Sequence, residues 1–206
     1  MKLDRNQIVD TALAVLEETG IDGLTTRLIA QRLGVQQPAL YWHFKSKRAL
    51  LDAMNDAILE RGHTRRIPFP DEAWRDFVRA NALSFRAALL GHRDGARVHA
   101  GTEANPGDLD QLEQQGQILV DAGMSPGDAM ELLTAIGRYT VGCVLEEQAD
   151  REGTTDPTDL DRAAEKYPVL SAALVRYRSG GHEGLFRAGL ELLIAGAQNR
   201  LNETSR

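Results

Sequence analysis

"LGVQQPALYWHFKSK", residues 33–47, is the stretch that decides how the first part of this chain folds. Aromatic residues make up only 5% of the sequence, yet Tyr41, Trp42 and Phe44 fall within four positions, with His43 between them. Neighbouring residues on a helix point about 100° apart, so one apolar stripe cannot bury all four rings. The sequence therefore predicts that some of these rings face outward.

The residues around this stretch have the spacing of a helix-turn-helix. Thr25 can cap a short helix, Ala30 is small enough for two helices to cross, and Gly34 can make the turn. Leu40 and Phe44, four positions apart on the next helix, are then expected to face inward. The pattern alone leaves two interpretations open: a DNA-binding helix-turn-helix, or a three-helix core fragment whose aromatic residues cover a neighbour.

In the DNA-binding interpretation, the second helix enters the major groove by its first residues. Gln37 can pair with adenine there, whereas Ala39 can make only apolar contact, for instance with a thymine methyl group. Tyr41, His43 and Lys47 can contact phosphate groups. The outward-facing aromatic residues would then form a rim against the DNA backbone.

The rest of the chain has the apolar spacing of helices, and no sustained alternation indicates a strand. We therefore expect an all-α fold of about ten helices, with a break at the two prolines of "RRIPFP", residues 65–70. The expected division is 1–46 for the helix-turn-helix domain, 47–66 for a connecting helix and 67–206 for a second helical domain. The expected helices cover residues 4–19, 25–34, a third from 38, a fourth from 46 past 58, then 72–91, 108–122, 125–149, 163–177 and 183–201.

Charge and cysteine content limit the class of protein. The chain carries a net charge of −6, but its first 50 residues hold seven basic and five acidic side chains, which leaves −8 for residues 51–206. A basic end on an acidic body suits a modular nucleic-acid binder, although this bias is small. Cys143 is the single cysteine, so no internal disulfide can form. No apolar run is long enough to span a membrane, and we expect a cytoplasmic protein.

Two of the expected helices carry apolar residues on more than one face. These are the helices over 125–149 and 183–201. Such helices need apolar neighbours on two sides, and a second copy of the chain would supply them. We therefore expect a homodimer.

One polar residue stands out in the second domain. Asn81 lies four positions after Phe77 and four before Phe85, on an otherwise apolar helix face. A buried amide without a partner costs about 1–3 kcal/mol, so Asn81 must find one. Either a nearby loop or a ligand could serve.

Longer stretches carry a resemblance to a known family. "LTTRLIAQRLGVQQPALYWHFKSKRALLDAM" (24–54) resembles the N-terminal domain of the TetR family. The likeness to its tetracycline-responsive members continues through "SFRAALLGHRDGARVHAGT" (84–102), "GCVLEEQ" (142–148) and "GLELLIAG" (189–196). It therefore covers nearly the whole chain, including the ligand domain.

This resemblance implies a transcriptional repressor that binds a palindromic operator as a homodimer and is released by a small polycyclic effector. Ala39 departs from the pattern, because these members have threonine there, and this leaves the preferred operator sequence open. By resemblance, the operator contacts are Thr26, Arg27, Gln37, Pro38, Tyr41, Trp42, His43 and Lys47, with Ala39 among them in the reading helix.

The resemblance also implies that the effector is tetracycline carrying Mg²⁺. His99 would bind the metal directly, with Thr102 and Glu146 of the partner subunit acting through water. Few protein ligands and several waters are normal for magnesium. The expected contacts to the organic part of the effector are His63, Asn81, Phe85 and Gln115.

Three positions of the expected ligand site depart from the family pattern. Glu103 replaces an arginine, Ala104 replaces a proline, and Arg138 replaces a histidine. Glu103 and Arg138 could pair with each other and preserve tetracycline binding. Alternatively, they mark a site for a different planar, polyketide-like ligand.

A metal-dependent enzyme is the rival from another class. His63, His99 and Glu146 could in principle hold a metal and activate water. However, the sequence has no H-x-x-x-H pair, nucleophile elbow, P-loop or glycine-rich dinucleotide motif. The sequence therefore predicts a binding protein that is not an enzyme.

Overall fold

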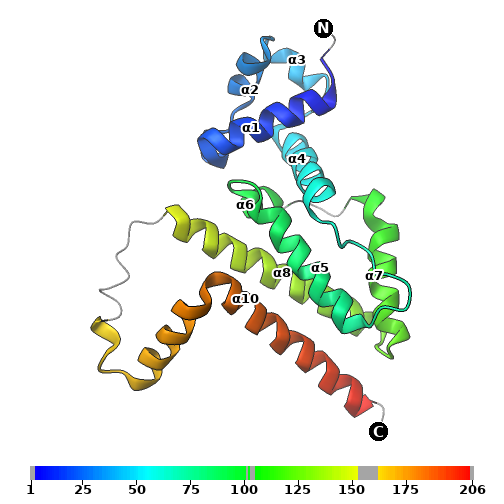
Figure 1. Cartoon of the computed structure of the whole chain (residues 1–206). Helices are drawn as coiled ribbons and strands as arrows, with labels where there is room; N and C mark the ends of the chain where they lie inside the picture. The colour runs from blue at the N-terminus through cyan, green and yellow to red at the C-terminus, as the bar shows by residue number, and fades with distance from the viewer. Residues whose placement is uncertain (1–2, 101, 103–104, 153–161, 205–206) are drawn as a thin grey trace.

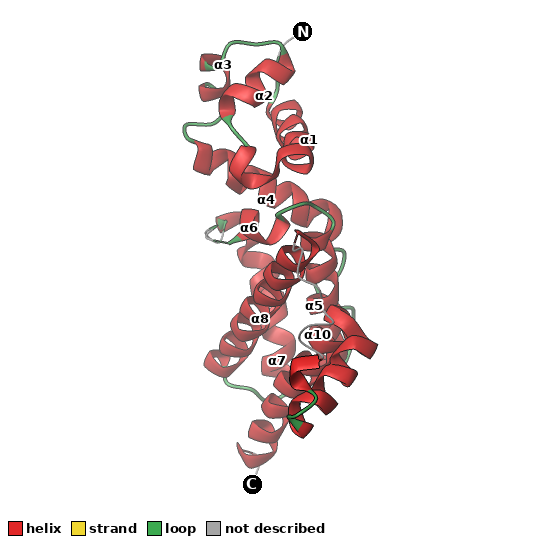
Figure 2. Cartoon of the chain, turned by 90° about the vertical axis from the view of Figure 1, so that its left-hand side faces the viewer, coloured by secondary structure: helices red, strands yellow, loops and turns green. Residues whose placement is uncertain are grey.

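Helices make up most of the computed structural model, which describes residues 3–100, 102, 105–152 and 162–204. No strand occurs within these ranges (Figures 1 and 2). The molecule is elongated, with the N-terminal helices at one end and the C-terminus near the other. The expected all-α fold is confirmed.

The N-terminal head consists of α1 (Arg5–Gly23), α2 (Thr26–Leu33) and α3 (Pro38–Tyr41). Its helix ends follow the local sequence signals. The backbone N–H of Gln7 donates to Asp4 at 2.8 Å in a capping box, and that of Leu28 donates to the Thr25 hydroxyl at 3.2 Å. Gly34 ends α2 in the left-handed conformation, with φ of 68°, where glycine is least strained.

Helix α4 (Lys47–Gly62) joins this head to the rest of the molecule (Figure 1). Ser46 caps it, as expected, by accepting from the Ala49 N–H at 3.1 Å. Its buried side chains Leu50, Met54 and Ile58 complete the apolar core of the head. The same core includes Ala88 and Val98 from the second half, so head and body are packed together.

Among the described residues, the body contains the five α-helices given below, a short helical stretch over 162–164 and one 3₁₀ turn, η1 (Pro106–Asp108). A second apolar core lies between four of these helices. Beside it, the buried Arg86 side chain pairs with Glu147, which also accepts from Arg151 at 2.7 Å. The helices are α5 (Trp74–Leu90), α6 (Gly95–His99), α7 (Leu109–Asp121), α8 (Pro126–Glu152) and α10 (Pro168–Thr204).

Two features of the body differ from expectation. The segment expected as a helix over 163–177 is helical at 162–164 and again from Pro168. From Pro168 it forms one element, α10, with the helix expected over 183–201, and this element bends at Gly181, where φ is 57° and ψ is −162°. The first half of α10 consequently projects away from the body (Figure 1). Helix α6 was not expected, because five residues are too few to show an apolar period.

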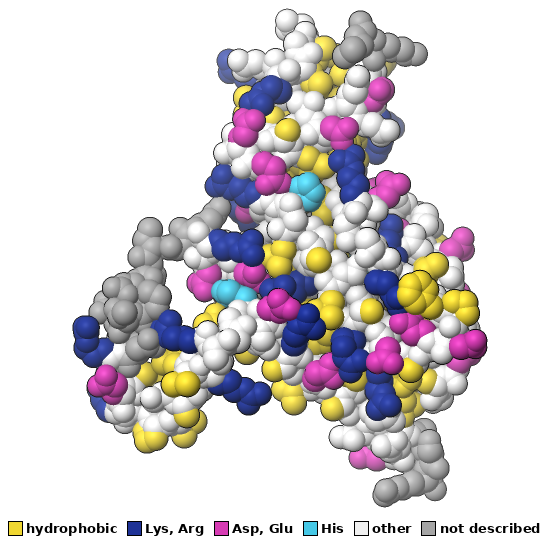
Figure 3. Space-filling view, in the orientation of Figure 1, with side chains coloured by type: hydrophobic (Ala, Val, Ile, Leu, Met, Phe, Trp, Pro, Cys, Tyr) yellow, Lys and Arg dark blue, Asp and Glu magenta, His cyan; other side chains and the backbone are white. Residues whose placement is uncertain are grey.

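Acidic and basic side chains are interspersed over one face of the body (Figure 3). Yellow apolar side chains are also visible there, including some on the projecting arm. Within the part of the chain that the structure describes, no helix is both long and apolar enough to cross a membrane.

Candidate nucleic-acid interface and ligand cavity

The exposed face of α3 is aromatic and polar. Leu40 and Phe44 are only 2% and 4% exposed and anchor the segment in the core of the head. Trp42, in contrast, is 90% exposed and Tyr41 is 48% exposed. This confirms the prediction that Leu40 and Phe44 face inward while some of the aromatic rings face outward. Burying Leu40 and Phe44 fixes α3 so that its remaining side chains point outward together.

A hydrogen bond ties the first residue of this face to α2. The Gln37 amide nitrogen donates to the Thr26 hydroxyl at 2.8 Å and lies 3.5 Å from the Tyr41 hydroxyl. These three side chains, from two helices, therefore form one polar cluster at the surface. Such a cluster offers donors and acceptors at fixed positions, which is what reading base edges requires.

The other residues expected to contact DNA lie at helix starts, on α3 or, for His43, just after α3. Arg27 is on the first turn of α2, Pro38 is the first residue of α3 and Lys47 is the first of α4, and all three are exposed. Ala39 and His43 are half-buried. Exposed basic groups and backbone N–H groups at helix starts can both contact phosphate.

The body contains a cavity of about 350 Å³, to which α4, α5, α7 and α8 all contribute. Val78, Ala82, Leu133 and Ile136 form much of its apolar wall. Apolar walls with a few converging polar groups are typical of small-molecule sites. Six residues expected to bind effector or metal line this one cavity: His63, Asn81, Phe85, His99, Thr102 and Gln115.

Three rings and one amide organise the cavity. The Phe85 ring lies between two imidazoles, with centroid distances of 5.5 Å to His63 and 5.0 Å to His99. Asn81 donates to the Arg65 carbonyl at 2.8 Å and lies 3.2 Å from His63 Nε2. Asn81 therefore has loop partners and also lines the cavity, so the two alternatives for its role are not exclusive.

Burial controls the protonation of both histidines. Desolvation, followed by the nearby Arg66 charge, lowers the pKa of His63 to about 4. Desolvation also lowers the pKa of His99. Near neutral pH both rings are uncharged, which is the form that accepts a hydrogen bond or binds a metal.

A polar shell around His99 includes a residue that sequence reasoning missed. Asn55 on α4 is 6% exposed, and its Oδ1 lies 2.9 Å from His99 Nδ1. The Thr102 hydroxyl donates to the His99 carbonyl at 2.8 Å. An amide among buried apolar residues, the signal that singled out Asn81, could have found Asn55 as well.

Charged residues at the cavity were also missed. Arg66 pairs with Asp108 at 2.9 Å, and the Gln115 amide donates to the Arg66 carbonyl at 2.6 Å. Asp56 lines the same cavity, and desolvation, then the charges of Asp108 and Asp52, raise its pKa. The cavity therefore combines an apolar wall with a charged border.

The remaining expected residues lie apart from this cavity. Arg138 lines an adjoining hollow with His99 and Thr102, and its side chain is exposed. Glu146 is exposed on α8 and does not line its own chain's cavity. Glu103 lies outside the described residues, and so does its suggested pairing with Arg138.

The described residues contain no group of three or more His, Cys, Asp or Glu side chains that could hold a metal ion. His63, His99 and Glu146 thus do not form the metal site that the rival enzyme would need. A metal ion bound at His99 would therefore need most of its other ligands from water, a bound small molecule or another chain.

Both halves of the chain match known families. Residues 8–54 match the bacterial regulatory proteins of the tetR family, and residues 67–201 match the tetracyclin repressor-like C-terminal domain. The tetracycline repressor protein class A from transposon 1721 of Escherichia coli is 46% identical over 205 residues. That match covers 97% of this chain and 92% of the relative.

Solved structures show the same similarity. A TetR variant from Acinetobacter baumannii AYE in complex with minocycline is 43% identical, with a TM-score of 0.83, over 97% of this chain and 99% of that one. TetR class A in complex with 5a,6-anhydrotetracycline and magnesium is 40% identical, with a TM-score of 0.75, over 96% and 99% of the two chains. The chain therefore belongs to the TetR family, and it is a transcriptional repressor, not an enzyme.

Proposed function

We propose that this repressor binds a palindromic operator as a homodimer and releases it when tetracycline carrying Mg²⁺ enters the cavity of the body. The observation that carries this proposal is the convergence of six expected effector and metal residues on one cavity, from positions as far apart as His63 and Gln115. Relatives solved with minocycline and with anhydrotetracycline and magnesium support it. A role on operator DNA would place the protein in the cytoplasm.

The chain works in three parts in this proposal. Residues 1–46 bind DNA, and residues 67–206 bind the effector and form the dimer contact. Residues 47–66 connect these two parts. Gln37, Pro38 and Ala39 face base edges, with Thr26 and Arg27 beside them. The phosphate contacts come from Tyr41, Trp42, His43 and Lys47.

His99 and Thr102 are the residues of this chain that would hold the magnesium ion, completed by Glu146 of the partner subunit. The neutral imidazole and the oxygen donors fit a hard dication that keeps several waters. When bound, the ion would supply positive charge that attracts oxygen atoms of the effector. The rest of the effector would contact His63, Asn81, Phe85 and Gln115, with Arg138 in the hollow that also holds His99. Glu103 is an expected ligand contact from the resemblance alone.

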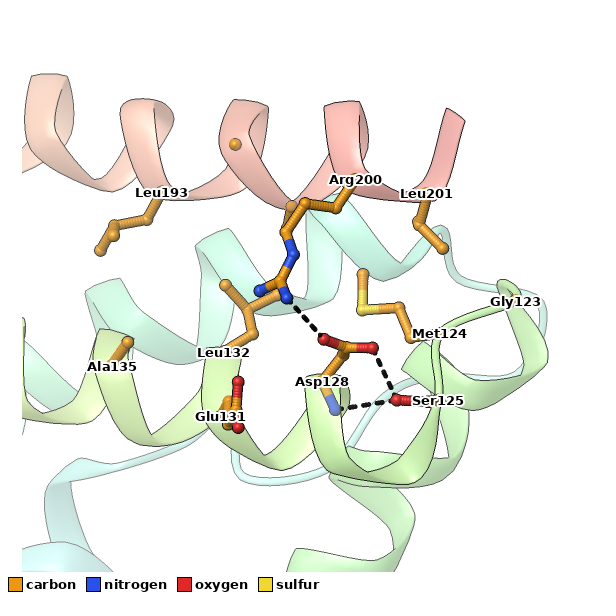
Figure 4. Close-up of a pocket in the computed structure, with 12 residues that line it drawn as sticks. Gly123, Met124, Ser125, Asp128, Glu131, Leu132, Ala135, Leu193, Arg200 and Leu201 are labelled. Atoms are coloured by element: carbon orange, nitrogen blue, oxygen red, sulfur yellow. Dashed lines mark hydrogen bonds and ion pairs between the residues drawn. The ribbon is translucent and has the colours of Figure 1, made fainter. Parts of the chain in front are cut away.

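A face formed by α8 and α10 is the proposed dimer contact. A groove of about 400 Å³ lies between the start of α8 and the end of α10, lined by Leu132, Ala135, Leu193 and other side chains (Figure 4). On α10, Leu192 is 75% exposed. Exposed apolar side chains beside an open apolar groove favour a second copy of the same two helices.

Release of DNA requires the cavity and the head to be coupled. Two contacts join α6, which carries His99, to the end of α1. Arg97 pairs with Asp22 at 2.9 Å, and the Ile21 N–H donates to the Asp94 carboxylate at 2.7 Å. The two recognition helices of a dimer fit DNA when they are about 34–36 Å apart, one helical turn. An effector that favours a different spacing lowers operator affinity by the coupling free energy.

A second candidate effector is a different planar, polyketide-like molecule. The Arg66–Asp108 pair and Asp56 on the cavity border favour it, because they would suit a ligand with polar groups at that edge. The two candidates share the same repressor architecture and differ only in the ligand.

Fluorescence titration with tetracycline, with and without Mg²⁺, tests the proposal. We expect saturable binding of one tetracycline per chain that depends on Mg²⁺, and loss of DNA binding at the same concentrations. Operator DNA must weaken tetracycline binding by the same factor, because the coupling is reciprocal. If tetracycline does not release the protein from operator DNA, the result would favour a different planar, polyketide-like effector.

A further inference from the structure

Asn55 is a buried polar residue in an apolar part of α4. It is 6% exposed and has the buried side chains Ala53, Met54 and Ile58 as neighbours on the helix. A buried amide without a partner costs about 1–3 kcal/mol. Its partner comes from α6, because Asn55 Oδ1 lies 2.9 Å from His99 Nδ1.

This contact determines where the proton of His99 sits. An amide oxygen can only accept, so the facing Nδ1 must carry the hydrogen. In a neutral imidazole the other nitrogen, Nε2, then has the free lone pair. Without an oxygen acceptor at Nδ1, the proton could reside on either nitrogen.

The orientation of the His99 ring is restrained from a second side. Phe85 meets it edge-on, with a centroid distance of 5.0 Å and an interplanar angle of 72°. Asn55 and Phe85 come from α4 and α5, so the ring is held between two helices while it lines the cavity. A ring fixed in both tautomer and orientation is prepared to donate its Nε2 lone pair.

We propose that Asn55 is a positioning residue, which holds His99 in the tautomer whose Nε2 can bind the magnesium ion of the effector. This inference rests on the proposed function, because it supposes an effector that carries a metal. Hydrogen bonds from a metal-binding histidine to a neighbouring acceptor fix the tautomer and raise the basicity of the ligand. Asn55 also attaches the metal ligand directly to α4, whose first residue is Lys47.

The tautomer can be measured without any effector. ¹⁵N-histidine-labelled protein gives distinct ring nitrogen signals for protonated and unprotonated positions, and the spectrum of His99→Gln identifies the His99 signals. We expect the wild type to carry the His99 proton on Nδ1. Asn55→Asp keeps an oxygen acceptor and should keep this tautomer, whereas Asn55→Leu removes the acceptor and should lose it. A proton on Nε2 in the wild type would overturn the inference.

Binding of magnesium tetracycline to the same three proteins gives the second readout. Loss of such a supporting hydrogen bond typically weakens metal affinity about 10–100-fold, and we expect this for Asn55→Leu. Asn55→Asp should bind within about threefold of wild type. Equal affinity of Asn55→Leu and wild type, or equal weakening by Asn55→Asp and Asn55→Leu, would mean that Asn55 has no positioning role. If Asn55→Leu destabilises the fold, the His99 tautomer of the wild type and of Asn55→Asp still tests the inference.

The two readouts separate this inference from the proposed function. Failure of wild-type protein to bind magnesium tetracycline would remove the proposed effector and the metal role of Asn55, while the tautomer spectrum would still report on the hydrogen bond. Normal wild-type binding with an Nε2 proton, or with no effect of Asn55→Leu, would remove the inference alone.

Discussion

The head and the cavity present polar groups in opposite ways. In the head, Tyr41 and Trp42 are exposed at the end of a short helix that the buried Leu40 anchors in the core. In the cavity, Asn81, His63 and other polar groups are half-buried and hydrogen-bonded to one another or to the backbone. DNA is a long, charged polymer, so only exposed side chains can contact it. A small-molecule effector enters a cavity, so the polar groups that bind it must already be held in position there.

This contrast predicts different responses to mutation. Side chains of the DNA face contribute little to stability, so their loss should affect binding alone. Paired polar groups of the body support the fold, so their loss should affect both. The four predictions below test this division, beginning with the largest effect.

Glu147→Ala should lower the free energy of unfolding by about 3–5 kcal/mol, because it leaves the buried Arg86 guanidinium without its main counter-charge. Chemical denaturation measures this loss. Glu183→Ala is the matched control, since it breaks an exposed pair with Arg187 and should leave stability unchanged. Equal, small effects of both changes would show that the buried pair is not a support of the body.

Leu40→Ala should cost about 2–5 kcal/mol of stability, because Leu40 is 2% exposed in the core of the head. Trp42→Ala, two residues along and 90% exposed, should leave stability within about 0.5 kcal/mol while reducing DNA affinity about tenfold. Thermal unfolding and DNA titration of both variants separate the two roles. If Trp42→Ala lowers the stability of the protein, the Trp42 ring contributes to packing of the fold.

Arg27→Ala and Lys47→Ala should weaken DNA binding in different ways. If Arg27 reads a base, its loss costs about 1–3 kcal/mol on operator DNA and relaxes sequence preference. If Lys47 contacts phosphate, its loss weakens all sequences alike and reduces the salt slope by about 1. Titration of operator and random DNA at several salt concentrations distinguishes the two. An Arg27→Ala loss that is equal on both DNAs would contradict the assignment.

His63 should make the folded state sensitive to mild acid. Its pKa is about 4 in the folded protein, against 6.5 for the unperturbed group, so between these values the unfolded state binds more protons. Stability should therefore fall as pH is lowered through 6.5 towards 4. Allowing for the partial exposure of the ring, we expect about 1 kcal/mol between pH 7 and pH 5.

His63→Gln is the control for this prediction, because glutamine does not titrate. Denaturation of both proteins at pH 7 and pH 5 gives the difference that belongs to His63. The same pH dependence in both would assign the effect to other groups.

The head could be predicted from sequence because its signals are local. The caps at Asp4, Thr25 and Ser46 involve residues three positions apart, and the inward pair Leu40 and Phe44 is four apart. Short-range spacing decides such features before any tertiary contact forms. The exposure of Trp42 followed from the same geometry.

The cavity could not be derived from spacing, because its partners are distant in sequence. Asn55 and His99 are separated by 44 positions, Arg66 and Asp108 by 42, and Gln115 contacts a carbonyl 49 positions away. Residue type alone made His99 one of several candidates, and only the family resemblance pointed to Gln115. Helix α6 was missed for a related reason: at Gly95 a Cβ atom would lie 2.1 Å from the Leu89 carbonyl oxygen, so tertiary packing dictates this turn.

At Gly62, its last residue, helix α4 has a point about which it can pivot. A Cβ atom there would lie 2.8 Å from Ala88 Cα, so α4 crosses α5 at this point with no room to spare. At about 1.5 Å per residue, Asn55 lies roughly 10 Å along the lever arm and Lys47 roughly 22 Å. A rigid swing about this pivot therefore moves the DNA end about twice as far as the metal end. A sub-ångström displacement of α4 at Asn55, beside His99, would therefore become about twice as large at Lys47, and α4 would not need to bend.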